Sequence, residues 1–477
     1  MNSQNNDAQI LLGSTIVERN EREELKNPYT NKVVSTVPKC NADDALNALK
    51  IAQKTKKIAK DTTLSQRCEW ILDVASALED NKEVMARIIT DEVAKPIKFS
   101  RIEVERCIET LRLSAETART FVGETINSDA MASGRKSIAF FRHEPVGVVV
   151  AITPFNFPLN LVAHKLAPAL VAGNTVVLKP TPEAPLTAYM FVKLFVDSKY
   201  AIKDALSVVY GDAEVGSALV ESDVARVISF TGSVQVGNII TKMAGIKKVS
   251  LELGGNAATF IDKTADLNHA ATRCAIGAFV NSGQVCISLQ RIYVHENVYD
   301  EFSILMKQES EKLKVGSPYE EDTFMGPLIN EEASQRALNW VESAIEEGAK
   351  ALLEPKIDGR IFSPVVMVDV TDDMNIICEE VFAPIVSLVK VKNFDDAAKR
   401  MNNSPYGLQF SVFTNDLSLA NNAIDELDAG GIVINDMPTL RFDIQPYGGI
   451  KLSGVGREGP RFALEEFTEI KSVVMLS

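Results

Sequence analysis

Histidine is scarce in this chain, and its cysteines are not paired. Histidines stand only at positions 143, 164, 269 and 295, and cysteines only at 40, 68, 107, 274, 286 and 378. No two cysteines have the C-x-x-C spacing, so we expect neither a metal site nor a disulfide framework. No histidine lies beside a cysteine, so a base for a cysteine nucleophile has to be another residue type.

Basic clusters and long apolar runs are also missing. The net charge is -14 and the 50 Lys and Arg residues form no long cluster, which argues against a nucleic-acid partner. The apolar stretch 146–152 is far shorter than the roughly 20 residues that span a bilayer. Residues 1–9 lack the basic and apolar regions of a signal peptide. We therefore expect a cytoplasmic protein with no membrane partner.

The chain has the length and the pattern of an α/β protein. Its 477 residues are enough for two or three domains of about 150 residues each. Helical patterns occupy 45–58, 64–81, 82–93 and 97–121. From residue 146 onward, short β-branched strands alternate with helices, which is typical of a Rossmann-like parallel sheet.

Polar and glycine residues follow the strands of this predicted sheet. The strands 146–152, 175–178, 207–210 and 227–230 lead into Pro154 to Pro158, Lys179-Pro180, Gly211, and Thr231 to Gly237. The carboxyl edge of such a sheet is where ligands bind. Gly232, with a helix starting near Ser233, is suited to a phosphate group, although G-x-x-x-x-G alone does not specify a dinucleotide. Asn156 either serves this edge or caps the helix predicted at 159–172.

Cys286 and Glu252 are the candidate reactive residues. Cys286 ends the turn Gly283-Gln284-Val285-Cys286, where glycine and an amide residue could hold a sulfur in an open pocket. The alternative is an inert buried cysteine. Glu252 stands between two leucines, where an unpaired charge is costly. It is either half of a salt bridge or a general base whose pKa is raised by desolvation. Gly254-Gly255 can admit another backbone or a ligand nearby.

Several motifs occur in one order along the chain. They are Thr153 to Asn156, Leu178 to Pro180, Phe230 to Gly237, Leu251 to Gly255, Gly283 to Cys286, Glu379 to Pro384, and the loop Gly448 to Gly459. Together they resemble the NAD(P)-dependent aldehyde dehydrogenase superfamily over essentially the whole chain. The stretch 435–446 is similar to the branch with lactaldehyde, phosphonoacetaldehyde and non-phosphorylating glyceraldehyde-3-phosphate dehydrogenases.

The resemblance implies how the chain is divided. It implies a Rossmann-type parallel-sheet cofactor domain (1–126 and 146–251), an α/β catalytic domain (252–445), small β oligomerisation strands (127–145 and 466–477) and a return segment (446–465). By the same resemblance, we expect a homodimer or a homotetramer. The loop 446–459 is too rich in glycine to be a regular element, and we expect a functional or packing loop.

The resemblance also implies the chemistry. Cys286 attacks the aldehyde, and the Asn156 amide with the Cys286 backbone N–H holds the oxyanion. Hydride transfer to the nicotinamide leaves a thioester, which water activated by Glu252 hydrolyses. The presence of Glu252 argues against acyl transfer to coenzyme A. Its presence together with Cys286 and Asn156 argues against a non-catalytic nucleotide-binding protein.

The cofactor implied is NAD or NADP. Lys179 is expected at the adenosine ribose, Gly232 and Ser233 at the pyrophosphate, and Glu380 at the nicotinamide ribose with Phe382 nearby. The other positions expected to contact the cofactor are Ile152, Thr153, Pro154, Phe155, Thr181, Pro182, Gly211, Phe230, Thr231, Val236, Leu253 and Gly254. Pro182 stands where NAD-preferring members often carry glutamate, so NADP use is plausible, although Glu183 is close by.

The substrate implied is a small hydroxylated or anionic aldehyde, such as lactaldehyde. The positions expected to contact it are Arg106, Phe157, Val285, Ile287 and Arg441. The alternatives are glyceraldehyde-3-phosphate, phosphonoacetaldehyde, a sulfo-aldehyde and succinate semialdehyde. Val285 replaces the arginine of glyceraldehyde-3-phosphate enzymes, which disfavours that substrate. Arg106 is either an ion-paired helix residue or an anion ligand, and Arg441 either binds an anion or pairs with Asp436 or Asp443.

Overall fold

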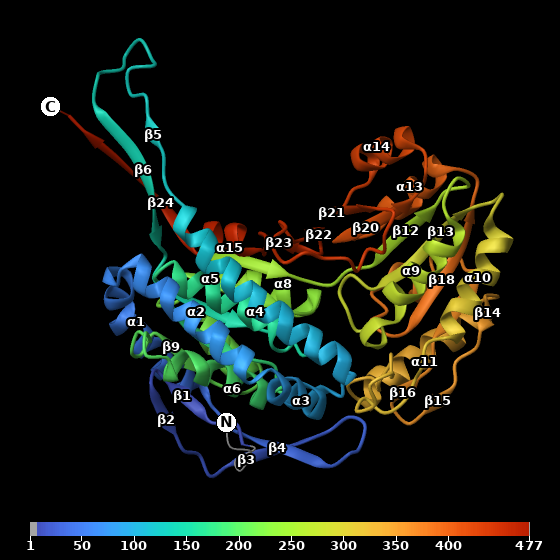
Figure 1. The fold of residues 1–477 in the computed structure, drawn as a ribbon, viewed down its shortest axis with the longest axis horizontal. Coiled ribbons are helices and arrows are strands. Elements are labelled where there is room, and N and C mark those ends of the chain that lie inside the picture. The colour runs from blue at the N-terminus through green and yellow to red at the C-terminus, as the bar shows by residue number, and fades with distance from the viewer. Residues whose placement is uncertain (1–6, 477) are drawn as a thin grey trace.

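Residues 7–476 are described in the computed structural model. Residues 1–6 and 477, which belong to the predicted N-terminal and C-terminal segments, lie outside this range. Figure 1 shows two α/β units side by side and a narrow β arm that extends from the first unit. Among the helices of the described residues, none combines the length and apolar character needed to span a membrane.

The first unit is built on an eight-stranded sheet. Its order is β2 (Thr15–Val17), β1 (Ile10–Leu12), β9 (Leu206–Val208), β8 (Thr175–Lys179), β7 (Val148–Ile152), β10 (Val227–Thr231), β11 (Lys248–Glu252) and β23 (Gly454–Val455). The strands from β9 to β11 are parallel, as predicted. Strands β1, β2 and β23 pair antiparallel at the two ends of the sheet, and the sequence pattern did not predict them.

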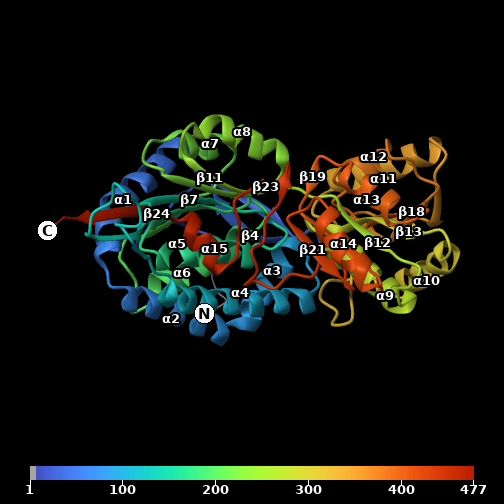
Figure 2. The same ribbon diagram turned by 90° about the horizontal axis from the view of Figure 1, so that it is seen from above.

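Helices cover both faces of this sheet. Figure 2 shows α7 (Ala213–Glu221) and α8 (Val234–Ala244) on one side, and α5 (Asn160–Val171) and α6 (Pro185–Asp197) on the other. The four N-terminal helices are α1 (Ala42–Asp61), α2 (Leu64–Asp80), α3 (Lys82–Val93) and α4 (Ile97–Thr120). Helix α1 starts three residues earlier than predicted, because Asn41 and Asp44 form a capping box.

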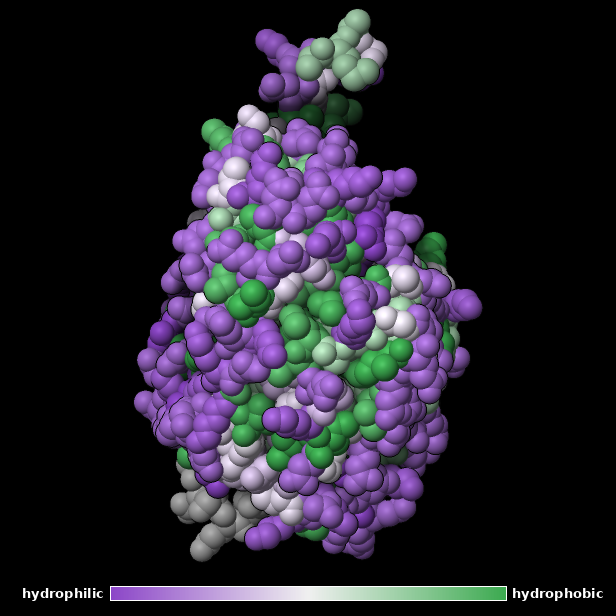
Figure 3. Space-filling view, turned by 90° about the vertical axis from the view of Figure 1, so that its right-hand side faces the viewer, coloured by the Kyte–Doolittle hydropathy of each residue, from purple (hydrophilic) through white to green (hydrophobic). Residues whose placement is uncertain are grey.

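The second unit is built on a seven-stranded sheet. Its order is β14 (Lys350–Leu353), β17 (Val365–Val368), β18 (Ile385–Val391), β13 (Leu289–His295), β12 (Ala257–Ile261), β20 (Gln409–Phe413) and β21 (Gly431–Ile434). Its helices are α9 (Leu267–Phe279), α10 (Tyr299–Glu311), α11 (Glu331–Glu346), α12 (Asn375–Cys378), α13 (Phe394–Asn402) and α14 (Leu417–Glu426). The face of this unit in Figure 3 is mostly hydrophilic, with apolar side chains interspersed.

The expectation that the loop 446–459 contains no regular element is wrong. The loop 446–459 contains two short strands, β22 (Ile450–Lys451), which pairs with β19 (Tyr406–Gly407), and β23, which pairs with β11. Gly454 permits the second pairing, because a Cβ there would lie 2.2 Å from the Leu251 carbonyl oxygen. The chain therefore leaves the second sheet and adds an edge strand to the first before α15 (Pro460–Glu466).

The remaining strands form the arm and two hairpins. The arm is a three-stranded antiparallel sheet of β24 (Thr468–Met475), β6 (Ile138–Pro145) and β5 (Thr125–Ile126). The hairpins are β3 (Arg22–Lys26) with β4 (Val33–Pro38), and β15 (Ile357–Asp358) with β16 (Ile361–Phe362). Strands β6 and β24 of the arm lie in the two segments predicted to mediate oligomerisation, whereas β5 lies just before the first of them. That role and the domain boundaries stay predictions.

A buried carboxylate joins α3 to the start of α6. Glu92 accepts hydrogen bonds from the backbone N–H groups of Leu186 and Thr187 and from the Thr187 hydroxyl. It is 1% exposed, and burial raises its pKa to about 7. Glu92 therefore caps the first turn of α6, whose N-cap residue Ala184 has no side chain suited to do so.

Glu92→Ala is expected to destabilise the first unit. It leaves these three donors and the buried Ser35 hydroxyl without an acceptor, and each such donor costs about 1–3 kcal/mol. We expect the free energy of unfolding to fall by roughly 3 kcal/mol or more, seen as a lower melting temperature. Glu83→Ala, on the same helix, is the control: it removes an exposed pair with Arg101 and should cost under about 1 kcal/mol. Equal melting shifts in the two variants would contradict the capping role.

Candidate active site

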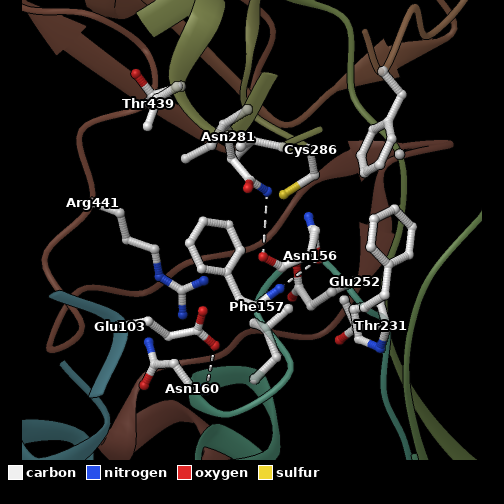
Figure 4. Close-up of a pocket in the computed structure, with 18 of the residues that line it drawn as sticks. Glu103, Asn156, Phe157, Asn160, Thr231, Glu252, Asn281, Cys286, Thr439 and Arg441 are labelled. Carbon is white, nitrogen blue, oxygen red and sulfur yellow. Dashed lines mark hydrogen bonds between the residues drawn. The ribbon is translucent and has the colours of Figure 1, made fainter. Parts of the chain in front are cut away.

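A cavity of about 640 Å³ lies at the carboxyl ends of β7, β10 and β11, bordered by residues of both units. It brings together the three predicted catalytic residues and all five predicted substrate positions: Asn156, Glu252, Cys286, Arg106, Phe157, Val285, Ile287 and Arg441. Figure 4 shows the side chains of Cys286, Asn156 and Glu252 next to one another. Asn156 and Cys286, which are 130 positions apart in the sequence, therefore meet here.

A strained turn presents Cys286 to this cavity. Asn281 and Ser282 have φ of 52° and 57°, and Gly283 has φ of 72°, so three left-handed residues follow one another. Gly283 is required, since a Cβ there would lie 2.2 Å from the Ala383 carbonyl oxygen. The Gln284 side chain accepts a hydrogen bond from Ile329 N at 2.9 Å, which ties the turn to the chain before α11.

Within residues 7–476, the Cys286 sulfur has apolar neighbours and one hydrogen-bond partner. The Tyr447 hydroxyl is 3.0 Å from Sγ, and Val285, Ile287 and Leu408 pack around it. Burial raises the pKa of the thiol to about 11, against the hydrogen bond from Tyr447, which lowers it. The sulfur therefore needs local help to ionise near neutral pH.

Glu252 ends β11 and is 4% exposed. Neither of its carboxylate oxygens has a hydrogen-bond partner, and no cation within residues 7–476 forms a salt bridge with it. Burial raises the pKa of this carboxyl well above its usual range, and the nearby Glu458 carboxylate raises it further. The salt-bridge alternative for Glu252 is therefore wrong, and the raised pKa is what the general-base hypothesis requires.

Asn156 does not cap the following helix. Its amide donates to the Gln284 carbonyl oxygen at 3.0 Å, and its Oδ1 accepts from Phe157 N. The start of α5 is capped instead by Glu103 on α4, which accepts from Leu159 N and Asn160 N. The capping alternative for Asn156 is therefore wrong, and its amide lies against the turn that carries Cys286.

The glycine pair after Glu252 allows two close approaches. A Cβ on Gly255 would lie 2.2 Å from the Cys286 carbonyl oxygen, and one on Gly254 would lie 2.4 Å from a Glu380 carboxylate oxygen. Gly255 N donates to Glu380 at 3.0 Å, and burial raises the pKa of Glu380 to about 7. The expectation that this pair admits another backbone is confirmed.

The predicted cofactor positions all follow the parallel strands or border the cavity. Nine line the cavity: Pro154, Phe155, Thr231, Gly232, Ser233, Leu253, Gly254, Glu380 and Phe382. The others are Ile152, Thr153, Lys179, Thr181, Pro182, Gly211, Phe230 and Val236, at or just beyond the ends of β7 to β10 or in the first turn of α8. Ser233 is the N-cap of α8, as expected, and the hydroxyl oxygens of Thr153 and Thr231 are buried without a partner. Unpartnered polar atoms beside a helix N-terminus fit a bound dinucleotide.

Both arginines form ion pairs as well as lining the cavity. Arg106 makes a two-point contact with Asp443, at 2.7 and 3.0 Å. Arg441 pairs with Glu458 at 3.1 Å, and its Nε is 3.6 Å from Asp443. The alternative partner Asp436 is wrong for Arg441, because Asp436 pairs with Arg273. Figure 4 shows the Arg441 guanidinium pointing toward Phe157.

Sequence reasoning missed the buried residues behind the cavity. Lys165 Nζ contacts Glu458 at 3.2 Å, and His164 Nε2 contacts Asp443 at 3.0 Å. Both come from α5, in which all twelve residues are buried. Two ionisable residues inside an apolar helix were a usable signal, because such groups are rarely buried without partners. Lys95 and Glu103, also 1–2% exposed and paired, had no comparable signal.

The fold and this cavity define a dehydrogenase-like enzyme with a cysteine at the carboxyl edge of a nucleotide-binding sheet. The aldehyde dehydrogenase family model matches residues 16–473. The chain is 43% identical to 3-sulfolactaldehyde dehydrogenase from Priestia aryabhattai over 95% of each chain. It is 40% identical to lactaldehyde dehydrogenase from Methanococcus aeolicus over 95% of this chain and 97% of the relative.

A solved structure agrees with these sequence matches. NADP-dependent glyceraldehyde-3-phosphate dehydrogenase from Bacillus halodurans, complexed with NADP, matches with a TM-score of 0.96 and 35% identity over 98% of this chain and 99% of that chain. The chain belongs to the aldehyde dehydrogenase family and is an NAD(P)-dependent oxidoreductase. The predicted family and α/β fold are therefore confirmed.

Gly255→Ala tests the close approach beside Cys286. The added Cβ must displace the Cys286 backbone, and a shift near 1 Å in a reacting group can cost about 100-fold in rate. We expect at least a ten-fold loss of kcat with an aldehyde, measured by reduced-nicotinamide absorbance. Gly316→Ala is the control, because the nearest atom to its new Cβ is 4.0 Å away. Wild-type turnover in Gly255→Ala would rule out this constraint.

Proposed function

We propose that this enzyme oxidises a small hydroxylated or anionic aldehyde to its carboxylate, through a thioester on Cys286 that water hydrolyses. The observation that carries the proposal is the meeting of Cys286, Asn156 and Glu252 in one cavity at the carboxyl edge of the parallel sheet. The relatives named for lactaldehyde and 3-sulfolactaldehyde support the substrate class.

In the first half of the reaction, the Cys286 sulfur forms a bond to the aldehyde carbon. The carbonyl oxygen gains the negative charge of a thiohemiacetal, and the Asn156 amide with the Cys286 backbone N–H donates to it. Such donors are worth about 3 kcal/mol each in comparable sites. The chemistry that a bound NAD(P) would supply is that of a hydride acceptor, and loss of hydride from this carbon would leave a thioester on Cys286. Residues Gly232, Ser233 and Lys179 are suited to its phosphates and ribose, and Glu380 to its nicotinamide ribose.

In the second half, Glu252 removes a proton from water, and the water oxygen attacks the thioester carbon. The carbon–sulfur bond breaks, the electron pair returns to sulfur, and the carboxylate product leaves. A raised pKa suits this task, because a base works best when its pKa lies near the working pH. The apolar walls of the cavity raise this pKa by excluding water from the carboxylate.

Glu252→Gln separates the two halves of the reaction. It keeps the size of the side chain and removes the base, so hydride transfer should give one burst of reduced cofactor per Cys286. Steady-state turnover should then fall by about 100-fold or more. Stopped-flow absorbance measures both phases. Cys286→Ser should abolish the burst as well, and unchanged turnover in Cys286→Ser would refute the mechanism.

The residues near Pro182 bear on whether the enzyme prefers NAD or NADP. Pro182 carries no charge at the position expected to meet the 2′-position of the ribose, and the Bacillus relative is named for NADP. Against this, the Thr181 hydroxyl is hydrogen-bonded to the Glu183 carboxylate beside the same site. We propose that NADP is accepted. A strong preference for NAD in kcat/KM would contradict this.

We propose that Arg106 and Arg441 supply positive charge to an anionic aldehyde. Arg106 is partly exposed, with 27% of its side chain accessible, whereas Arg441 has 8% and is paired with Glu458. Asp443 already satisfies two donors of Arg106, so an anion would have to bind its remaining donors. Val285 and Ile287 leave the wall nearest the sulfur apolar.

Comparing a charged with a neutral aldehyde tests whether each arginine binds the substrate. In Arg106→Gln, kcat/KM for 3-sulfolactaldehyde should fall roughly 10- to 100-fold more than for lactaldehyde, since a hydrogen bond to a charged group is worth about 1.5–3 kcal/mol. Arg441→Ala is measured alongside it. Arg101→Ala, on the same helix but outside the cavity, is the control. Unchanged discrimination in a variant would exclude that arginine from substrate binding.

The proposal also covers the number of subunits and the cellular compartment of the enzyme. We propose a cytoplasmic homodimer or homotetramer in which the arm of β5, β6 and β24 contacts another subunit. Exposed apolar side chains on the arm, Ile126, Ile138, Ile470 and Val474, support this because they have no cover within the described residues of one chain.

A further inference from the structure

We propose that Tyr447 is a further catalytic residue, whose hydroxyl donates a hydrogen bond to the Cys286 sulfur whenever that sulfur carries negative charge. The proposal rests on the proposed function of Cys286. Within residues 7–476, the Tyr447 hydroxyl is the one hydrogen-bond partner of this sulfur, at 3.0 Å. It lies in the same cavity as the reacting atoms.

The tyrosine is held from two sides. Its backbone N–H donates to the Glu458 carbonyl oxygen at 3.0 Å, and Glu458 N donates back to Tyr447 O at 2.7 Å. The Arg441 guanidinium carbon lies 3.7 Å from the centre of its ring, which is the geometry of a cation–π contact. Glu458 is itself anchored to Lys165 and Arg441. The hydroxyl is therefore fixed beside the sulfur before any aldehyde arrives.

The charged groups that face the sulfur explain why a donor is needed. Arg441 favours the thiolate, whereas Glu252 and Glu380 oppose it whenever they are ionised, and burial opposes it as well. Burial raises the pKa of Tyr447 well above its usual range, so its hydroxyl keeps its proton and can only donate to a thiolate.

The hydroxyl acts at two points of the reaction. Before attack, it stabilises the thiolate that forms the bond to the aldehyde carbon. During hydrolysis, the carbon–sulfur bond breaks and its electron pair returns to sulfur, where the same O–H donates to the developing charge. The proton stays on the tyrosine oxygen in both steps, so Tyr447 is a hydrogen-bond donor and not a general acid.

Tyr447→Phe removes the hydroxyl and keeps the ring that stacks on Arg441. The readout is the pH dependence of Cys286 alkylation by iodoacetamide, followed on the Cys286 peptide by mass spectrometry without aldehyde or cofactor. We expect the apparent pKa of Cys286 to rise by about one unit. Below that pKa, alkylation should slow about three-fold, because the remaining thiolate is rarer but more nucleophilic. The value of kcat should fall while KM for the cofactor stays the same.

Tyr406→Phe is the matched control. Its hydroxyl contacts Glu379 at 3.4 Å and lies outside the cavity, so the Cys286 profile should not change. Melting curves of both variants check that they fold. An unchanged alkylation profile in folded Tyr447→Phe would overturn the proposal. If wild type oxidises no aldehyde while the profile still shifts, the proposed function fails and the contact between Tyr447 and the sulfur stands.

Discussion

Two buried carboxylates hold the segment that crosses between the two sheets, and the active cavity depends on them. Asp443 contacts Arg106 and His164, and Glu458 contacts Lys165 and Arg441. Buried charges are costly unless paired with good geometry. Because the partners Arg106, His164 and Lys165 belong to α4 and α5 of the first unit, these pairs determine where the crossing segment lies against that unit. The segment in turn supplies Tyr447 and, through β23, an edge of the first sheet.

The same pairs set the electrostatics of the cavity. Lys165 and Arg441 lower the pKa of Glu458 to about 2, so Glu458 stays charged. That charge, together with burial, raises the pKa of Glu252. Two glutamates in one site therefore have pKa values shifted in opposite directions. Glu252 has the unusual environment because the nearby cations Lys165 and Arg441 pair with Glu458 and not with it.

The candidate site residues were predictable because each stands at an unusual position in a local pattern. Glu252 interrupts an apolar strand, Lys179 ends one, and Cys286 follows a glycine–amide turn. Their partners were harder to predict. His164 and Lys165 are single breaks in an apolar helix, and Tyr447 is one aromatic residue beside two glycines. No local pattern indicates that a tyrosine 161 positions from a cysteine will touch its sulfur. The sequence does not predict the two strands within 446–459 either, since strands of two residues have no detectable period.

The parallel sheet and the family follow from the amino-acid sequence alone, because strand composition, turn glycines and motif order depend on neighbouring residues. The three-dimensional contacts were needed to choose between the alternatives that the residues left open. Asn156 is not a helix cap because Glu103 fills that role, and Glu252 has no salt bridge because the nearby cations pair with Glu458. Side chains from distant segments compete for the same hydrogen-bond and ion-pair partners, and the folded structure decides which pairs form. Burial makes each polar group that is left without a partner costly in free energy.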